Sequence, residues 1–495
     1  MSFADGFRGN SNLTRTENGA TVKSTTGSAL LNLFARVGGL RQASKSEINR
    51  LYLDARNEDE DKELADNLIL YTRNIREGGI GERRIARILL KTIALKDPAK
   101  VRRNLDTIVS AGRWDDLFVF EGTSVENDAL EFMKEQFRKD VLDMGKGESI
   151  SLLAKWLPSA NTSSKETRRL ARKVYTYFGL SERTYRKTLS ALRKYLDVVE
   201  KKMSAQDFTA IDYQAVPSVA MTRYRSAFGK HDFERFNAYI NAVTSGDAKI
   251  NATVTYPYEL AKPYVDAVTG WYSRSRANLD PVLEAQWKAL PNYVKGEHNA
   301  IVLADVSGSM TGLPMATSIS LGIYFAERNT GAYKNLVMSF TDKPSLYTLN
   351  PNASLLSRVQ EVASHEGLNT NLDLAFERIY DIAKREHDAP SALIVISDGE
   401  IDNYRRRLES RGSSFEGIAE KWQAKYASIG LKAPKLIMWN VASRGDRYIA
   451  SKENRGVAYV SGSSAATFKE LTTLISQDAM TAMKEILSRP QFSWR

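Results

Sequence analysis

The strongest constraint on the fold is a change of sequence texture near residue 298. From about residue 29, short segments with apolar residues at spacings of three and four follow one another, separated by Gly or Pro. This pattern is typical of amphipathic helices. After the change, β-rich apolar runs alternate with helical stretches, and the runs are 300–305, 336–340, 345–349, 392–398, 435–442 and 456–462. Strands that alternate with helices predict βαβ units and a mostly parallel sheet.

We therefore expect an α + α/β chain with three parts. Residues 1–28, rich in Ser, Thr, Asn and Gly, are expected to form a flexible or surface-draped arm. Residues 29–297 are expected to form helical hairpins stacked into a HEAT-like solenoid or ring, without a strict repeat period. Residues 298–495 are expected to form a doubly wound sheet domain.

Composition excludes several classes of protein. The chain has no cysteine, so disulfides, thiolate zinc sites and cysteine nucleophiles are excluded, and a cytoplasmic location is expected. It has no long apolar run and begins with a polar segment, so we expect neither a membrane span nor a secretory signal. A Walker A motif, an HExxH motif and a GxSxG elbow are all missing, and we expect no enzymatic activity.

The positive charge is concentrated in one segment. Residues 151–230 hold sixteen Lys and Arg against six Asp and Glu, whereas the whole chain has a net charge of +11. Such a local excess favours binding of a polyanion. The alternative is a solvated helix face that acidic segments elsewhere in the chain balance.

Two successive helices are expected to carry this charge, the second beginning after Ser181. Few acidic residues lie nearby in the sequence. The candidate phosphate contacts are Arg168, Arg169, Arg172, Lys173, Arg183, Arg186, Lys187, Arg193 and Lys194, with Arg223 and Arg225 further along. The interleaved Tyr175, Tyr177, Tyr185 and Tyr195 have two interpretations, core packing or stacking on the bases of single-stranded RNA.

Oxygen-bearing side chains follow two of the predicted strands. Asp305, Ser307 and Ser309 follow the first strand, Asp398 ends a later one, and Thr370 precedes a helix. Ligand sites of parallel sheets lie at the carboxyl ends of strands, and these oxygens suit a hard divalent ion such as Mg²⁺. The alternative is a tight loop after the strand, with Asp398 capping a turn.

These five residues match the DxSxS, Thr and Asp pattern of the metal-ion-dependent adhesion site, so residues 298–495 resemble a von Willebrand factor A domain. The helical part resembles the TROVE module of Ro-type RNA-binding proteins and a related uncharacterised family of phages, bacteria and plants. The motifs that carry this resemblance lie at 72–90, 111–120, 154–164, 217–240 and 253–264. It implies a ring of helical repeats that binds non-coding RNA and is closed by the von Willebrand domain.

Two hypotheses follow. The first is a non-catalytic RNA-binding protein whose basic helices contact RNA with single-stranded ends. The second is a protein-interaction scaffold, in which the metal at Asp305 and Asp398 accepts an acidic residue from a partner protein. Neither hypothesis involves a membrane or DNA specificity.

Overall fold

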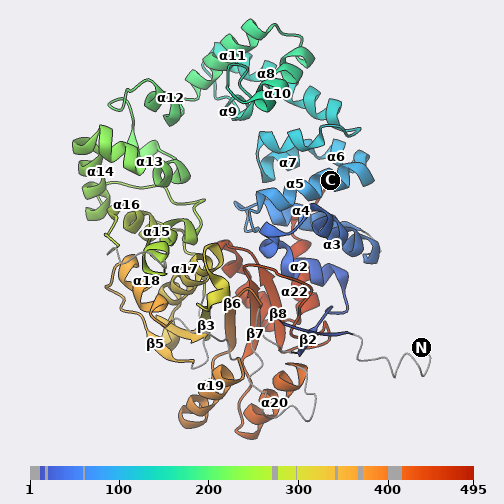
Figure 1. Ribbon diagram of the computed structural model, residues 1–495, viewed down its shortest axis with the longest axis vertical. Helices are drawn as coiled ribbons and strands as arrows, with labels where there is room; N and C mark the ends of the chain where they lie inside the picture. The colour runs from blue at the N-terminus through green and yellow to red at the C-terminus, as the bar shows by residue number, and fades with distance from the viewer. Residues whose placement is uncertain are drawn as a thin grey trace. The chain divides into compact units, whose positions relative to one another are not determined.

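The computed structural model describes residues 12–16, 21–59, 62–269, 277–296, 298–340, 344–365, 372–399 and 415–495. The chain divides into two compact units, and Figure 1 shows the elements of each. The first unit contains residues 1–85 and 252–492, and the second contains residues 86–251 and 493–495. The predicted three-part division rests on sequence texture and not on packing, and it stays a prediction.

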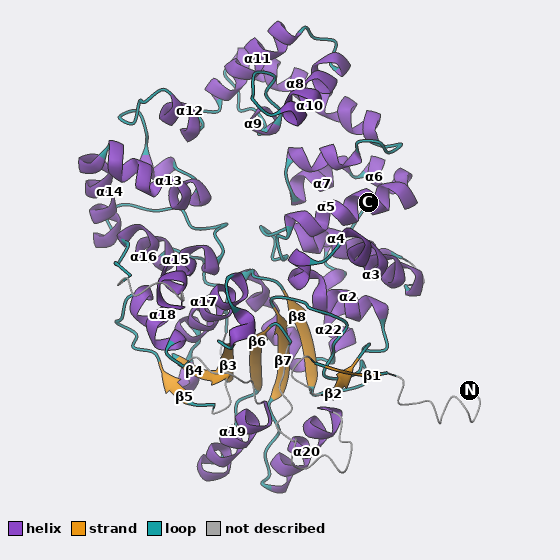
Figure 2. Cartoon of the chain, viewed as in Figure 1, coloured by secondary structure: helices purple, strands orange, loops and turns teal. Residues whose placement is uncertain are grey.

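A six-stranded sheet lies in the first unit (Figure 2). Its order is β5-β4-β3-β6-β7-β8, and all neighbours are parallel except β4 and β5. The strands are β3 (Ala300–Asp305), β4 (Leu336–Phe340), β5 (Leu346–Thr348), β6 (Ala392–Ser397), β7 (Lys435–Asn440) and β8 (Val457–Ser461). Each predicted apolar run contains one of these strands, so the predicted mixture of helices and a mostly parallel sheet is confirmed. A helical-repeat ring or solenoid stays a prediction.

Helices cover the sheet because its strands are apolar on both faces, as β3 and β6 show by being buried throughout. Helix α17 (Leu313–Arg328) packs on β3, β4 and β6, and Ser318 Oγ donates to the Ile396 carbonyl at 3.1 Å. Near β7 and β8 lie α21 (Leu471–Ser476) and α22 (Ala479–Leu487). Helices α19 (Leu372–Glu386) and α20 (Phe415–Ser428) lie side by side (Figure 1), and the rings of Phe376 and Trp422 stack between them.

The described part of residues 1–28 contains two strands. Strands β1 (Leu13–Arg15) and β2 (Thr21–Lys23) pair antiparallel, and Lys23 forms a β-bridge with Tyr448. The backbone N–H of Lys452 donates to the Thr26 carbonyl at 2.8 Å. Backbone hydrogen bonds therefore tie residues 12–16 and 21–28 to the sheet part, and the predicted arm stays a prediction.

The segment after these strands packs tightly on β8. It comprises α2 (Ala29–Arg36) and the 3₁₀ helix η1 (Val37–Gln42). The Gly38 N–H donates to Ser461 Oγ at 2.9 Å, and Ser461 Oγ donates to the Phe34 carbonyl at 3.0 Å. A Cβ on Gly38 would lie closer than 3.0 Å to backbone atoms of Ser461 and Gly462, so only glycine permits this approach.

Further helices complete the first unit. They are α3 (Lys45–Glu58), α4 (Glu63–Arg73), α15 (Pro257–Thr269), α16 (Pro281–Lys288) and α18 (Leu355–Ala363). Helix α15 packs on α17 and α18, so residues 252–296 belong to the same body as the sheet. Helix α5 (Arg83–Lys96) leads from the first unit into the second.

The second unit is helical in its described part. Its elements after α5 are α6 (Pro98–Arg103), α7 (Leu105–Ala111), η2 (Trp114–Phe120), α8 (Glu126–Lys146), α9 (Leu153–Trp156), α10 (Lys165–Tyr177), α11 (Glu182–Tyr195), α12 (Val199–Ser204), α13 (Ser218–His231) and α14 (Phe233–Ser245). Helix α10 packs with α11, and α13 packs with α14. Phe137 contacts Phe178 and Tyr185 in the core under α8, α10 and α11. Among the described helices of both units, none has the length and apolar character needed to cross a bilayer.

Candidate functional site

The first cluster of candidate side chains lies where β3 and β6 end. Strand β4 follows β3 on one side, whereas β6 lies on the other side of β3, so the chain reverses its winding direction at this pair. Ligands of open α/β sheets bind outside the carboxyl ends of strands at such a switch point. Asp305 is the last residue of β3, and Asp398 follows the end of β6. We call the cluster of Asp305, Ser307, Ser309, Ser397 and Asp398 the carboxylate corner.

Asp305 is fully buried, and both of its carboxylate oxygens accept hydrogen bonds. The Ser307 N–H donates to Oδ1 at 3.0 Å, and the Ser397 hydroxyl donates to Oδ2 at 2.6 Å. Burial raises the pKa of Asp305 to about 7, the bond from Ser397 opposes this rise, and the charge of nearby Asp398 adds to it. A cation beside the two carboxylates would stabilise the charged form of Asp305 and lower its pKa again.

One cation beside Asp398 is a side chain of the protein. Arg444 Nε lies 3.2 Å from Asp398 Oδ2, and another nitrogen of the same guanidinium donates to the Ser309 carbonyl. Arg444 thus joins the two loops of the carboxylate corner. Its own side chain is 37% exposed, so water reaches it from one side.

The loop that carries Arg444 is held by the N-terminal helices. The Ser443 N–H donates to the Gly39 carbonyl at 2.9 Å, and Arg36 Nε donates to Ser443 Oγ at 2.6 Å. Arg36, which is buried, also forms ion pairs with Asp446 and Glu47. Residues about 400 positions apart in the sequence therefore fix the backbone beside the carboxylate corner.

The structure brings together four of the five predicted metal ligands. Ser307 Oγ lies 3.1 Å from Ser309 Oγ, and both follow the buried Asp305. Thr370 lies outside the described residues. The described residues contain no group of three or more His, Asp or Glu side chains that could hold a metal. The predicted set has two carboxylates, its other members being hydroxyls.

Sequence reasoning missed Ser397 and Arg444. Ser397 is adjacent to Asp398 in a run of strand residues, and its pairing beside Asp305 follows from the register of β3 and β6, in which Ala304 is opposite Ile396. Once the order of the strands is known, this register predicts that Ser397 lies beside Asp305. Arg444 lies in a loop after β7, and nothing in its local sequence indicates that it reaches Asp398.

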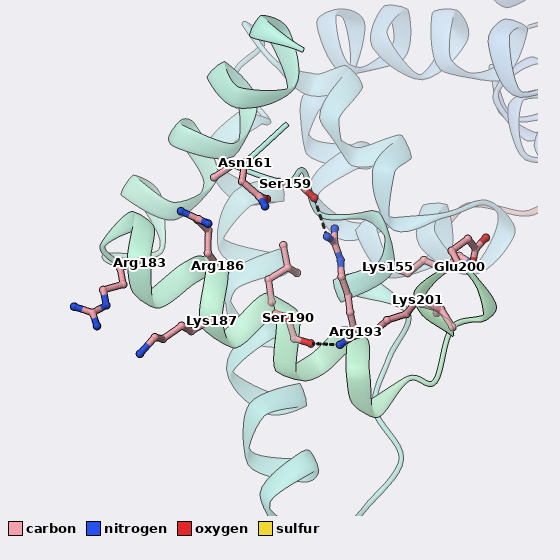
Figure 3. Close-up of a pocket in the computed structure, with 13 residues that line it drawn as sticks. Lys155, Ser159, Asn161, Arg183, Arg186, Lys187, Ser190, Arg193, Glu200 and Lys201 are labelled. Atoms are coloured by element: carbon pink, nitrogen blue, oxygen red, sulfur yellow. Dashed lines mark hydrogen bonds between the residues drawn. The ribbon is translucent and has the colours of Figure 1, made fainter. Parts of the chain in front are cut away.

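The second cluster is a pocket of about 810 Å³ in the helical unit (Figure 3). It lies between helix α11, the loop from α9 to α10, and the start of α12. We call it the basic pocket, and it is lined by Lys155, Ser159, Ala160, Asn161, Arg183, Arg186, Lys187, Leu189, Ser190, Arg193, Val198, Glu200 and Lys201. This volume is in the range of pockets that hold small-molecule ligands.

Helix α11 supplies most of the positive charge because of its periodicity. It begins after Ser181 as predicted, and the Ser181 hydroxyl caps it by accepting from the Thr184 N–H at 3.1 Å. Its polar side chains in the pocket recur at spacings of three and four, and they are Arg183, Arg186, Lys187, Ser190 and Arg193. Tyr185, Leu189 and Leu192 are buried, and of these Leu189 also lines the pocket.

Arg193 is fixed in place by the loop that precedes α10. Its three guanidinium nitrogens donate to the Ala154 carbonyl at 2.8 Å, the Ser159 hydroxyl at 2.8 Å and the Leu157 carbonyl at 2.6 Å. These partners are neutral, so they leave its positive charge uncompensated. In Figure 3, Arg186 and Arg193 extend from α11 toward the loop that carries Ser159 and Asn161.

The basic pocket contains little negative charge. Its one described carboxylate is Glu200. Among the described residues, no carboxylate lies within 4.0 Å of the charged nitrogens of Lys155, Arg183 or Lys187, and Arg186 has one exposed pair with Glu182 at 3.7 Å. Exposed pairs of this kind contribute little energy. The pocket therefore presents net positive charge to solvent.

Helix α10 differs from α11 in its charge balance, and the predicted contact of its cations with RNA stays a prediction. Arg169 and Lys173 have acidic partners, because η2 and α8 bring Glu121 and Glu126 beside them. Arg169 and Lys173 each lie 2.6 Å from Glu121, and Lys173 also pairs with Glu126. Hydrogen bonds from Arg169 and Lys173 lower the pKa of Glu121 to about 2. The scarcity of acidic residues nearby in the sequence gives no sign of this pairing.

The other predicted phosphate contacts lie outside the residues that line the pocket. Arg168, Arg172, Lys194 and Arg223 are exposed, and Arg225 is half-buried and donates to the Thr222 carbonyl. Sequence reasoning in turn missed Lys155 and Lys201. Lys155 and Lys201 lie 46 positions apart, and only the packing of α9 and α12 beside α11 brings them together.

Tyr185 follows the packing interpretation, whereas Tyr195 is 40% exposed and both interpretations of it stay predictions. Tyr185 is buried and donates to the Pro158 carbonyl at 2.8 Å. The hydroxyls of Tyr177 and Tyr195 donate to the carbonyls of Asn127 and Glu148. The Tyr175 ring packs against Tyr185.

Comparison with known proteins gives matches of three kinds. A domain of unknown function (DUF2828) matches residues 161–298, and another domain of unknown function (DUF7788) matches residues 299–487. An uncharacterized protein of Acanthamoeba polyphaga mimivirus is 28% identical over 520 aligned residues, covering 96% of this chain and 87% of that protein. The crystal structure of the Deinococcus radiodurans RO (RSR) protein is similar with a TM-score of 0.43 and 16% identity, covering 90% of this chain and 99% of that chain. The two domain matches meet between residues 298 and 299.

Proposed function

We propose that this protein binds RNA without catalysing a reaction on it, and that the basic pocket is the binding site. The observation that carries the proposal is the convergence of six cationic side chains with one carboxylate around a pocket of about 810 Å³. Most contacts between proteins and nucleic acids are made to phosphates by arginine, lysine and small polar side chains. RNA is the proposed polyanion because the helical part resembles the TROVE module in sequence.

The pocket favours recognition of the phosphate backbone over recognition of bases. Among the described lining residues none is aromatic, so a stacking platform for a base is missing from this set. Arginine and lysine bind phosphates irrespective of sequence. The proposed binding is therefore tolerant of RNA sequence.

We expect the affinity for a short single-stranded RNA to fall steeply with salt. Each phosphate contact releases about 0.7 counterion on a single strand, so four contacts give a slope of about −3 for log K against log salt. Fluorescence anisotropy across a series of salt concentrations measures the slope. An affinity that stays constant between low and physiological salt would contradict the proposal.

We further propose that the carboxylate corner holds a divalent ion. The donor set fits such an ion, because two buried carboxylates and two serine hydroxyls present hard oxygen ligands. Asp305, Ser307, Ser309 and Asp398 would hold the ion, with Thr370 as a fifth candidate. Mg²⁺ there would supply positive charge and an open coordination position, and Arg444 would have to give up its ion pair with Asp398.

Binding of Mg²⁺ should stabilise the protein more at high pH than at low pH. The pKa of Asp305 is about 7 in the folded state and 3.8 in an ordinary environment. Without a metal, the folded state therefore holds a proton that the unfolded chain releases above about pH 4, and the free energy of unfolding falls between about pH 4 and pH 7. Mg²⁺ favours the charged carboxylate and reverses that loss. We expect Mg²⁺ to raise Tm by roughly 2–4 °C at about pH 8 and by much less at about pH 5.

Melting curves with Mg²⁺ and with EDTA at both pH values measure this effect. Asp305→Asn should abolish the Mg²⁺-dependent rise in Tm, whereas Asp54→Asn, at an exposed carboxylate on α3, should leave it unchanged. Equal melting curves with Mg²⁺ and EDTA at both pH values would reject the metal site.

A second candidate function uses this metal. An acidic residue of a partner protein would occupy the open coordination position, and the protein would act as an interaction scaffold. The donor set supports this candidate, because two buried carboxylates and two serine hydroxyls leave room at an ion for a further oxygen ligand. Recovery of partners that resist nuclease and are released by EDTA would distinguish it from RNA binding. A cytoplasmic location stays a prediction.

A further inference from the structure

We propose that the basic pocket binds the terminal phosphate group of an RNA strand in preference to an internal stretch of its backbone. This inference rests on the proposed RNA binding and adds which part of the RNA enters the pocket. The ligand chemistry is a phosphate monoester, which carries a charge of about −1.5 to −2, compared with −1 for a phosphodiester.

The first argument is charge. The six cations Lys155, Arg183, Arg186, Lys187, Arg193 and Lys201 and the single carboxylate Glu200 give the pocket a net charge of +5. An internal segment short enough to enter a pocket of about 810 Å³ brings one negative charge per nucleotide. A terminal monoester brings more negative charge into the same volume. The ligand that best compensates the pocket is therefore a strand end.

The second argument is the arrangement of fixed donors. Arg193 is held rigid by three hydrogen bonds, and Lys201 Nζ is held by the Ser190 carbonyl at 3.3 Å. Ser159 Oγ accepts from Arg193, so the Ser159 hydroxyl keeps its own hydrogen to donate. Donors fixed before binding lose little conformational entropy when a ligand arrives. Arg186 extends toward the same loop as Arg193, which places two guanidinium groups on one side of the pocket (Figure 3).

The third argument is the contrast within α11. Arg186 and Arg193 extend toward the loop with Ser159 and Asn161 (Figure 3). Arg183 and Lys187 extend away from that loop, toward the left of Figure 3. Arg183 and Lys187 are exposed. We assign Arg186, Arg193 and Ser159 to the terminal phosphate, and Arg183 and Lys187 to the phosphodiesters that follow it.

The test uses one unstructured oligoribonucleotide made in three forms: with a 5′-phosphate, with a 3′-phosphate, and with hydroxyls at both ends. Fluorescence anisotropy at constant ionic strength gives the three affinities. We expect at least one phosphorylated form to bind about tenfold more tightly than the hydroxyl form. A nucleoside monophosphate serves as competitor, and it should displace the RNA only at concentrations far above the RNA dissociation constant.

Arg186→Gln should remove the advantage of the terminal phosphate, while the hydroxyl form loses only a few-fold in affinity. Arg186 is exposed, and an unchanged unfolding midpoint would show that the variant folds. Lys187→Gln is the matched control, and it should weaken all three forms equally.

The outcomes separate this inference from the proposed function. Equal affinity for the three forms, with binding still lost on charge reversal in the pocket, overturns the inference and leaves RNA binding in place. Affinity that is independent of every pocket substitution overturns both. If the nucleoside monophosphate displaces the RNA at concentrations near the RNA dissociation constant, the assignment to RNA is overturned and the pocket is a nucleotide site.

Discussion

Replacement of Arg183, Arg186 and Lys187 by Glu should lower the affinity for single-stranded RNA by about 100-fold or more at moderate salt. Three cations that line the basic pocket become three anions, so phosphate contacts are lost and repulsion is added. The slope of log K against log salt should also become shallower by about 2, at about 0.7 per lost contact. Anisotropy titrations of the triple variant and the unchanged protein, at several salt concentrations, measure both quantities.

The triple variant should fold normally. Arg183, Arg186 and Lys187 are exposed, and within the described part of the chain their one ion pair is that of Arg186 with Glu182 at 3.7 Å. Surface substitutions of this kind change the free energy of unfolding by about 0.5 kcal/mol or less. If the unfolding midpoint is unchanged, the variant is folded, and the loss of affinity is then due to the altered pocket.

A second triple variant controls for net charge. Arg103, Arg138 and Lys139 are exposed in the same helical unit and do not line the basic pocket, and among the described residues they have no carboxylate within 4.0 Å. Their replacement by Glu lowers the net charge by the same amount. We expect a loss of affinity below about threefold, because these side chains do not line the pocket and salt screens exposed charges that make no direct contact with the ligand. Equal losses in the two triple variants would show that overall charge, and not the basic pocket, governs binding.

The largest expected effect on stability is that of Gly38→Ala. The added Cβ would lie closer than 3.0 Å to backbone atoms of Ser461 and Gly462 at the end of β8. Backbone on both sides cannot move aside as a flexible side chain can, so η1 and β8 must separate. The hydrogen bond from the Gly38 N–H to Ser461 Oγ would be lost with that separation. We expect the free energy of unfolding to fall by about 3 kcal/mol or more.

Gly145→Ala is the matched control. Gly145 lies in α8, and a Cβ there meets nothing within 4 Å. Alanine should stabilise this helix by about 0.5–1 kcal/mol relative to glycine. Denaturant unfolding of both variants measures the difference. Equal midpoints would contradict the close packing of η1 on β8.

Much of the fold could be predicted from local patterns. Each apolar run after residue 298 contains a strand, because parallel strands buried on both faces require continuous apolar residues. The start of α11 after Ser181 followed from a capping hydroxyl and helical periodicity. Asp305 and Asp398 could be placed at one edge because the carboxyl ends of parallel strands share that edge.

The remaining features depend on residues that are distant in sequence. Arg444 reaches Asp398 from the loop after β7, and Glu121 reaches Arg169 from a segment 48 positions earlier. The contact of Gly38 with Gly462 joins opposite ends of the chain. Local patterns in a single sequence carry no information on such pairs, so the charge balance of α10 and the position of the N-terminal segment could not be predicted.

The division of the chain into units has a consequence for its synthesis on the ribosome. Residues 86–251 form a unit whose elements are contiguous except for the last three residues of the chain, whereas α2 and η1 need β7 and β8 as packing partners. At about 5–20 residues per second, roughly 20–80 s pass before those strands emerge. During that delay the apolar face of α2, with Leu31, Leu33 and Phe34, has no sheet to cover it. The nascent chain therefore exposes an apolar, aggregation-prone surface early. A chaperone that covers this surface would raise the yield of folded protein.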